Sequence, residues 1–146
     1  MAVNEAVLNA VPQPVSHALP GKGQLWTGRV LYVLLLIFLL FDAVPKILGA
    51  EFVLKASAPF GFTRGELMEI GLSLLFCTIL YVIPRTSVLG AALLTAYLGG
   101  AVEAVHHAHM PAFNLCFPIL FAVTVWISLW LRMPQLRSVF PLVRAR

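Results

Sequence analysis

The chain has 146 residues, of which 60% are hydrophobic and only 11% are charged. A soluble domain carries charges on roughly a quarter of its residues, so most of this chain must face a medium other than water. The net charge of +4 does not indicate nucleic-acid binding, because the basic residues lie at the ends of apolar segments and form no single patch. The lipid bilayer is therefore the expected environment, and the length suits one folded domain.

Residues 1–24 are rich in proline and glycine and show no sustained hydrophobic period, which predicts a mobile N-terminal tail. A signal peptide is the alternative interpretation, but this segment has no basic start and the apolar run that follows exceeds the core of a signal peptide. Residues 25–146 are predicted to form one membrane domain.

Four apolar segments have about the 20 residues that a helix needs to cross the hydrocarbon core. They run over about Gly28–Leu48, Gly65–Ile83, Val88–Val105 and Phe113–Leu131. A soluble helical bundle is disfavoured because no segment carries the polar stripe of a water-facing helix. The predicted fold is an all-α, integral membrane four-helix bundle with up-down-up-down topology.

The basic residues predict which side of the membrane each end occupies. With four spans, both termini share a side with the turn at Pro84 and Arg85. Seven basic residues fall on that side: Lys22, Arg29, Arg85, Arg132, Arg137, Arg144 and Arg146. The opposite side has three: Lys46, Lys55 and Arg64. Because Lys and Arg concentrate in cytoplasmic loops, both termini are predicted to be cytoplasmic.

Acidic residues and histidines gather at the opposite, outer end of the predicted bundle. Asp42 and Lys46 are four residues apart, so they share one helix face and can pair. Ionisable groups inside membrane helices usually face the bundle interior and often mark a site. The predicted polar pocket is lined by Lys46, Glu69, Glu103 and His106 or His107, with Asp42, Glu66 and Asn114 as further candidates.

Three interpretations of that pocket stay open. Glu103-x-x-His106 places two metal ligands on one helix face, as in di-iron bundles, but the chain has no second Glu-x-x-His, so a metal is only a weak candidate. Histidine and glutamate near the bilayer edge can also handle protons or a quinone. In the third interpretation the groups only form ion pairs that hold the helix ends together. No nucleophile elbow or phosphate loop appears, so whether the chain is an enzyme is undecided.

Two cysteines and two glycines are predicted to have structural roles and no role in chemistry. Cys77 and Cys116 lie in different apolar segments without metal-ligand spacing, so we expect packing or lipid-facing residues. Gly99 and Gly100 are expected to permit close approach of another helix, because small residues line helix contacts in membranes.

Three stretches carry a family resemblance: Glu66-Leu-Met-Glu-Ile-Gly71, Leu80-Tyr-Val-Ile-Pro-Arg-Thr86 and Leu89-Gly-Ala-Ala-Leu-Leu-Thr-Ala-Tyr-Leu-Gly-Gly-Ala-Val102. Together with Asp42-Ala-Val-Pro-Lys46 at the end of the first span, they resemble the DoxX-like family of small bacterial membrane proteins. The resemblance covers roughly Gly28 to Arg144. Lys46 and Glu69 match the family's helix-end lysine and second-helix glutamate. The family's single histidine would fall at Val105, where this chain instead has histidines at the next two positions.

The resemblance implies a multi-pass protein of the bacterial inner (plasma) membrane. The wider DoxX/DoxD group includes subunits associated with quinone-linked sulfur oxidation and with thiol and superoxide defence. The leading hypothesis is therefore an accessory subunit of a quinone- or thiol-linked redox system, with a quinone as candidate cofactor, an oxidoreductase as candidate partner, and a homo-oligomer as a further option. The alternatives are a small proton- or ion-coupled transporter or channel, and a structural membrane protein without its own activity.

Overall fold

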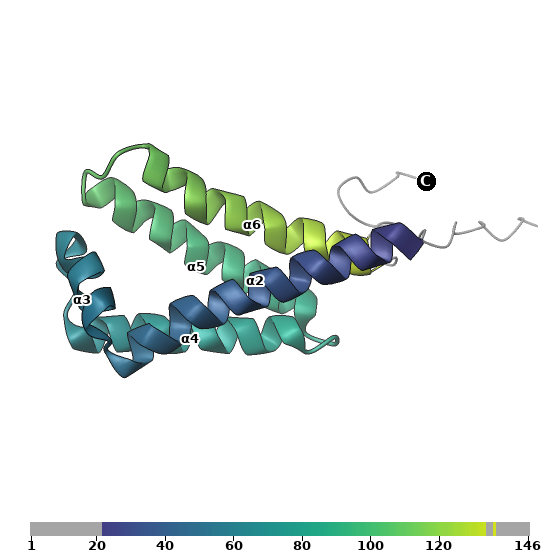
Figure 1. Cartoon of the computed structure of the whole chain (residues 1–146), viewed down its shortest axis with the longest axis horizontal. Helices are drawn as coiled ribbons and strands as arrows, with labels where there is room; N and C mark the ends of the chain where they lie inside the picture. Colours follow the sequence, from purple (N-terminus) through teal and green to yellow (C-terminus); the bar gives the residue numbers. More distant parts are fainter. Residues whose placement is uncertain (1–21, 134–135, 137–146) are drawn as a thin grey trace, which may run out of the picture.

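The computed structural model describes residues 22–133 and 136, and this part of the chain is helical without strands. Its four long helices are α2 (Lys22–Leu48), α4 (Arg64–Val82), α5 (Ser87–His107) and α6 (Phe113–Arg132) (Figure 1). All four are long and apolar enough to cross a membrane, as the sequence predicts. Lys22 to Gln24, which were assigned to the tail, belong to α2; the rest of the predicted tail lies outside the described residues.

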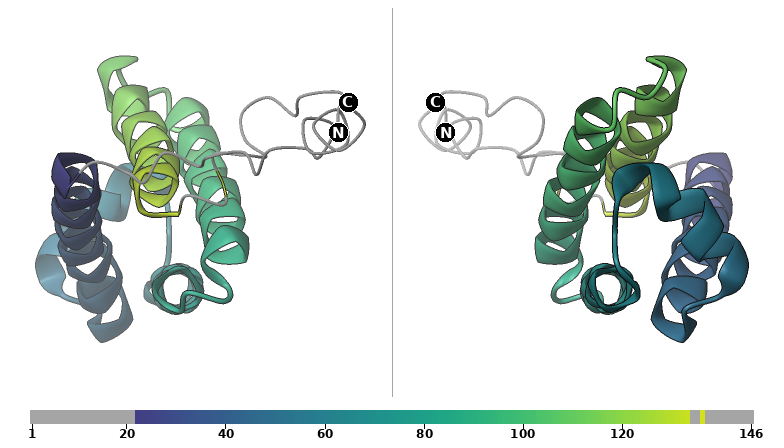
Figure 2. Two further views of the ribbon diagram at one scale, coloured as in Figure 1. Left: turned by 90° about the vertical axis from the view of Figure 1, so that its right-hand side faces the viewer. Right: turned by 90° about the vertical axis from the view of Figure 1, so that its left-hand side faces the viewer.

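The four long helices form a ring in which each packs against two others. α2 contacts α4 and α6, and α5 contacts the same two helices from the opposite side. Figure 1 shows successive long helices joined at alternate ends of the bundle, and Figure 2 shows the ring from both ends. The first and last long helices are therefore neighbours, and the turns between helices gather at two ends.

Apolar side chains fill the inside of the ring. The core cluster consists of Leu35, Leu39, Ala43, Leu74, Cys77, Tyr81, Ala91, Leu94, Val125 and Leu129. The hydroxyl of the fully buried Tyr81 donates a hydrogen bond to the carbonyl oxygen of Val125 (3.0 Å). This bond avoids the free-energy cost of burying an unpaired hydroxyl group. The outward surface is also apolar, with exposed residues such as Phe41, Phe76 and Leu120, as lipid contact requires.

Glycines set how closely α4 approaches its two neighbours. A Cβ at Gly90 would overlap the backbone of Tyr81, so the α4–α5 turn closes only because residue 90 has no side chain. A Cβ at Gly71 would lie 2.9 Å from the Cβ of Lys46, so α4 presses directly on the end of α2. The expectation for Gly99 and Gly100 was wrong within the described chain: both are exposed, and a Cβ at either would meet nothing within 4 Å.

The connection between α2 and α4 contains a short helix and a 3₁₀ turn that were not predicted from the sequence. A short helix, α3 (Glu51–Ser57), runs into a 3₁₀ turn, η1 (Ala58–Phe60), which contacts α5. Gly49 and Gly61 flank this connection with φ of 65° and 71°, a left-handed conformation that glycine adopts without strain. We refer to residues 50–60 as the outer cap, because they lie across one end of the ring (Figure 1).

Candidate functional site

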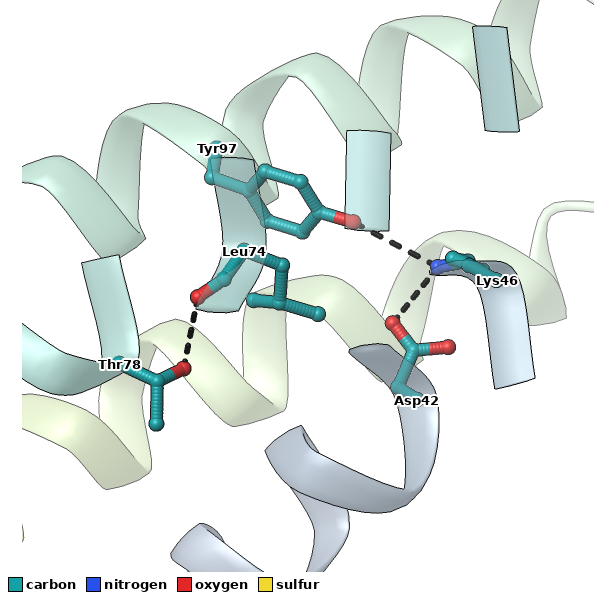
Figure 3. Close-up of polar contacts among 5 residues, drawn as sticks. All are labelled: Asp42, Lys46, Leu74, Thr78 and Tyr97. Carbon is teal, nitrogen blue, oxygen red and sulfur yellow. Dashed lines mark hydrogen bonds and ion pairs between the residues drawn. The ribbon is translucent and has the colours of Figure 1, made fainter. Parts of the chain in front are cut away.

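The last turns of α2 carry an ion pair that the i, i+4 spacing predicts correctly. Nζ of Lys46 donates to Oδ2 of Asp42 at 2.7 Å, and the two side chains are 17% and 38% exposed (Figure 3). α4 approaches this part of α2 closely, since a Cβ at Gly71 would lie 2.9 Å from the Cβ of Lys46. A cation and its counter-ion are thus held together within an otherwise apolar helix end, where an unpaired charge would be costly.

Tyr97 of α5 completes this polar group and was not predicted from the sequence. Lys46 Nζ also donates to the hydroxyl oxygen of Tyr97 at 3.4 Å, across 51 positions of sequence (Figure 3). Tyr97 lies midway along α5, whereas tyrosines that anchor a helix at the headgroup level lie near its ends. That position is the signal that could have identified it. We call Asp42, Lys46 and Tyr97 the polar triad.

Two members of the polar triad, Lys46 and Tyr97, line an apolar cavity of about 420 Å³ between α4, α5 and the outer cap. Only Lys46, Ser57 and Tyr97 contribute side-chain polar atoms to it. The lining residues are Lys46, Ser57, Phe60, Phe62, Leu67, Ile70, Ala96, Tyr97, Gly100, Ala101, Ala104 and Val105. The volume lies within the range of small-molecule sites, and an apolar lining with a few convergent polar groups is their usual composition.

A second hollow of about 570 Å³ adjoins this cavity on the side of the outer cap. It contains Glu103 and His107, both exposed, and it shares Gly100, Ala104, Phe60 and Phe62 with the apolar cavity. The two phenylalanine rings stack with their centroids 5.9 Å apart. The aromatic pair therefore lines both the apolar cavity and the second hollow.

The other predicted site residues lie elsewhere. Glu69 and His106 are exposed and line neither hollow. Asn114 donates to the sulfur of Met110 in the turn before α6. Of the predicted residues, Asp42 and Lys46 thus form an ion pair, and Glu103 and His107 line the same hollow. The functional role of each stays a prediction.

Glu66 has a structural role at the start of α4. The backbone N–H of Thr63 donates to Oε2 of Glu66 (2.7 Å), while the N–H of Glu66 donates to the hydroxyl of Thr63 (3.4 Å). This reciprocal arrangement is a capping box, and it satisfies backbone donors that a helix start leaves unpaired. The pattern Thr63-x-x-Glu66 is visible in the sequence and could have been assigned there.

Among the described residues, both cysteines are free thiols and the predicted metal ligands form no complete site. Cys77 is a buried free thiol and packs in the core cluster, and Cys116 is an exposed free thiol. Among residues 22–133 and 136, no group of three or more His, Cys, Asp or Glu side chains is close enough to hold a metal ion. Glu103 and His106 therefore gain no third ligand from this part of the chain.

A comparison with protein-family models matches residues 30–128 to the DoxX-like family. The chain belongs to the DoxX-like family. The matched region covers most of all four long helices and contains the polar triad and both hollows. No curated protein and no solved structure matched the chain significantly. The DoxX-like assignment and the four apolar helices together make this a multi-pass membrane protein.

Proposed function

We propose that this DoxX-like protein is an accessory subunit of a quinone-linked redox system in the bacterial inner membrane, and that its apolar cavity holds the quinone ring. The observation that carries the proposal is that Lys46 and Tyr97 of the polar triad line a cavity that is otherwise mostly apolar. A quinone has the matching chemistry, because its ring is flat and apolar and its carbonyl oxygens accept hydrogen bonds.

The donors of the polar triad suit a carbonyl oxygen. An ammonium group has three donor hydrogens, of which Asp42 takes one and Tyr97 accepts a second. Because Tyr97 accepts from Lys46, its own hydroxyl hydrogen is available to a ligand in the cavity. Asp42 balances the charge of Lys46, so the site offers a charge-assisted donor, worth about 1.5–3 kcal/mol, without a net charge among the helices.

The accessory role rests on the family. Reduction of a quinone to the quinol consumes electrons and protons; the electrons would come from the reduced donor of a partner oxidoreductase and the protons from water. The DoxX-like chain would bind and orient the quinone, while the partner performs the electron transfer.

The orientation of the chain is part of the proposal. The sequence places seven basic residues on the side of the termini and three on the side of the outer cap, so we place both termini in the cytoplasm. The polar triad then lies toward the periplasmic side. A reporter active only in the cytoplasm should be active when fused after Arg146 and silent when inserted at Gly61; the reverse pattern would invert the topology.

Equilibrium binding tests the quinone site. The full chain in lipid nanodiscs should bind a short-tailed benzoquinone, and Tyr97→Phe or the charge-neutral pair Asp42→Asn/Lys46→Met should each weaken binding about tenfold, since one such donor is worth about 1.4 kcal/mol. Lys55→Met is the matched control, because Lys55 belongs to an exposed ion pair with Glu51 and lines neither hollow.

Two outcomes would count against the proposal. Wild-type protein that binds no quinone would remove it, and so would binding that none of the variants changes. Proton flux through liposomes in the absence of quinone, reduced by Glu103→Gln, would favour the transporter alternative.

A further inference from the structure

The lining of the apolar cavity includes exposed residues of α5 on the lateral surface of the bundle. On this helix the lining runs from Tyr97 and Ala101, which are half-buried, to Ala96 and Gly100, which are exposed. A single cavity therefore extends from the ammonium group of Lys46 to the surface that faces lipid.

The surface of α5 at this opening carries only small side chains. From Gly90 to Gly100 its exposed residues are Ala92, Thr95, Ala96, Gly99 and Gly100. The outward faces of the other long helices instead carry large apolar residues, such as Phe41 on α2, Phe76 on α4 and Leu120 on α6. The lack of side-chain bulk coincides with the place where the cavity meets the surface, and a Cβ at Gly100 would meet nothing within 4 Å.

Resting on the quinone site proposed above, we propose that Ala96 and Gly100 form a lateral exit through which the isoprenoid tail of the bound quinone passes into the bilayer. Gly100 also borders the hollow that contains Glu103 and His107, whereas Ala96 lines the apolar cavity and not this hollow. That hollow carries two ionisable side chains, whereas in the bilayer the apolar surface of the tail stays out of water. The ring thus lies against the polar triad and the tail crosses the α5 surface.

A helix from another subunit is the competing occupant of this surface. Ala92, Ala96 and Gly100 are spaced four residues apart, a pattern that also favours close helix packing in membranes. The two occupants differ in which residues matter. Helix packing would depend on Gly99 as well as Gly100. The tail exit depends on Ala96 and Gly100, because among the exposed residues from Gly90 to Gly100 only these two line the cavity.

The test compares two quinones that share one ring, one with a long isoprenoid tail and one without a tail, on the full chain in nanodiscs. For the wild type we expect tighter binding of the tailed form. Gly100→Leu should weaken the tailed form about tenfold, which corresponds to lost contact with about two methylene groups, and should change the tail-less form less than about twofold. Gly99→Leu is the matched control and should leave both affinities within about twofold.

The results separate this inference from the function on which it rests. If the wild type binds neither form, the quinone site and the exit are both wrong. If the wild type binds but Gly100→Leu leaves the tailed form unchanged, or weakens both forms equally, the exit is wrong and the site stands. Equal losses for Gly99→Leu and Gly100→Leu, with a change in oligomeric state, would assign the surface to a partner helix and overturn the exit.

A second pair of variants covers the case in which Gly100→Leu does not fold. Ala96→Leu fills the same opening from one turn earlier, and Ala92→Leu places the same side chain on the exposed face outside the cavity. The expected results are those of Gly100→Leu and Gly99→Leu, respectively. A tailed-quinone affinity that is the same in Ala96→Leu and Ala92→Leu would overturn the exit.

Discussion

Lys46 and Asp42 show how a charge is accommodated near the end of a membrane helix. Their carboxylate and ammonium groups are 2.7 Å apart and largely shielded, whereas Lys55 and Glu51, also four residues apart, are separated by 3.8 Å with both side chains more than 80% exposed. Screening by water makes the exposed pair nearly neutral in energy. Removing one partner of the shielded pair leaves a charge in apolar surroundings, and this costs more.

Asp42→Asn should therefore lower the free energy of unfolding by about 1–2 kcal/mol, a value reduced from that of a fully buried pair because Asp42 is partly exposed. Glu51→Gln, the matched exposed carboxylate, should change it by less than about 0.5 kcal/mol. Reversible unfolding in mixed detergent micelles measures both. Equal effects of the two substitutions would show that the shielding of Asp42 has no energetic importance.

The sequence predicts part of this group and not the rest, for a physical reason. Asp42 and Lys46 lie on one helix, so their spacing alone places them together. Tyr97 is on another helix, and its contact with Lys46 depends on how α5 is rotated and how far it is shifted against α2 and α4. Glu69, which matched a family pattern, faces outward for the same reason: the rotation of α4 is set by packing at Gly71 and Leu74.

At the scale of the helix, the sequence predicts the four long elements well because each is a continuous apolar run of spanning length. The predicted starts and ends differ from the observed ones by up to six residues, the largest shift being at the start of α2, where polar residues from Lys22 onward continue the helix. The outer cap was missed because α3 has only seven residues, too few for a hydrophobic period to be seen. Small residues were also ambiguous, since the sequence does not show which glycines face a neighbouring backbone.

The two kinds of glycine on α5 give a direct test of helix packing. Gly90→Ala should lower the free energy of unfolding by about 1–3 kcal/mol, because its Cβ would overlap the backbone of Tyr81 and force α4 and α5 apart. Gly99→Ala, on the same helix, should be neutral or stabilising by up to about 1 kcal/mol, since alanine favours the helix and the site is open. Unfolding in mixed micelles compares them; a larger loss for Gly99→Ala would contradict the packing described here.

At the scale of the whole molecule, the ring of helices has two chemically different ends. The end with the outer cap carries the polar triad and the hollow that contains Glu103 and His107, and the opposite end of the described chain carries Arg85 and Arg132. This polarity was predictable from charge alone. The cavity was not, because its walls come from α4, α5 and the outer cap together and exist only once the ring has closed.

Photo-crosslinking tests directly whether a quinone ring occupies the cavity beside Lys46 and Tyr97. The full chain in nanodiscs would be irradiated with an azido-quinone, and the labelled peptides would be identified by mass spectrometry with and without excess unlabelled quinone. We expect competable adducts on the cavity walls contributed by α4 and α5, between Leu67 and Ile70 and between Ala96 and Val105. Adducts confined to the outward faces of α2 and α6, or labelling that excess quinone does not reduce, would contradict this expectation.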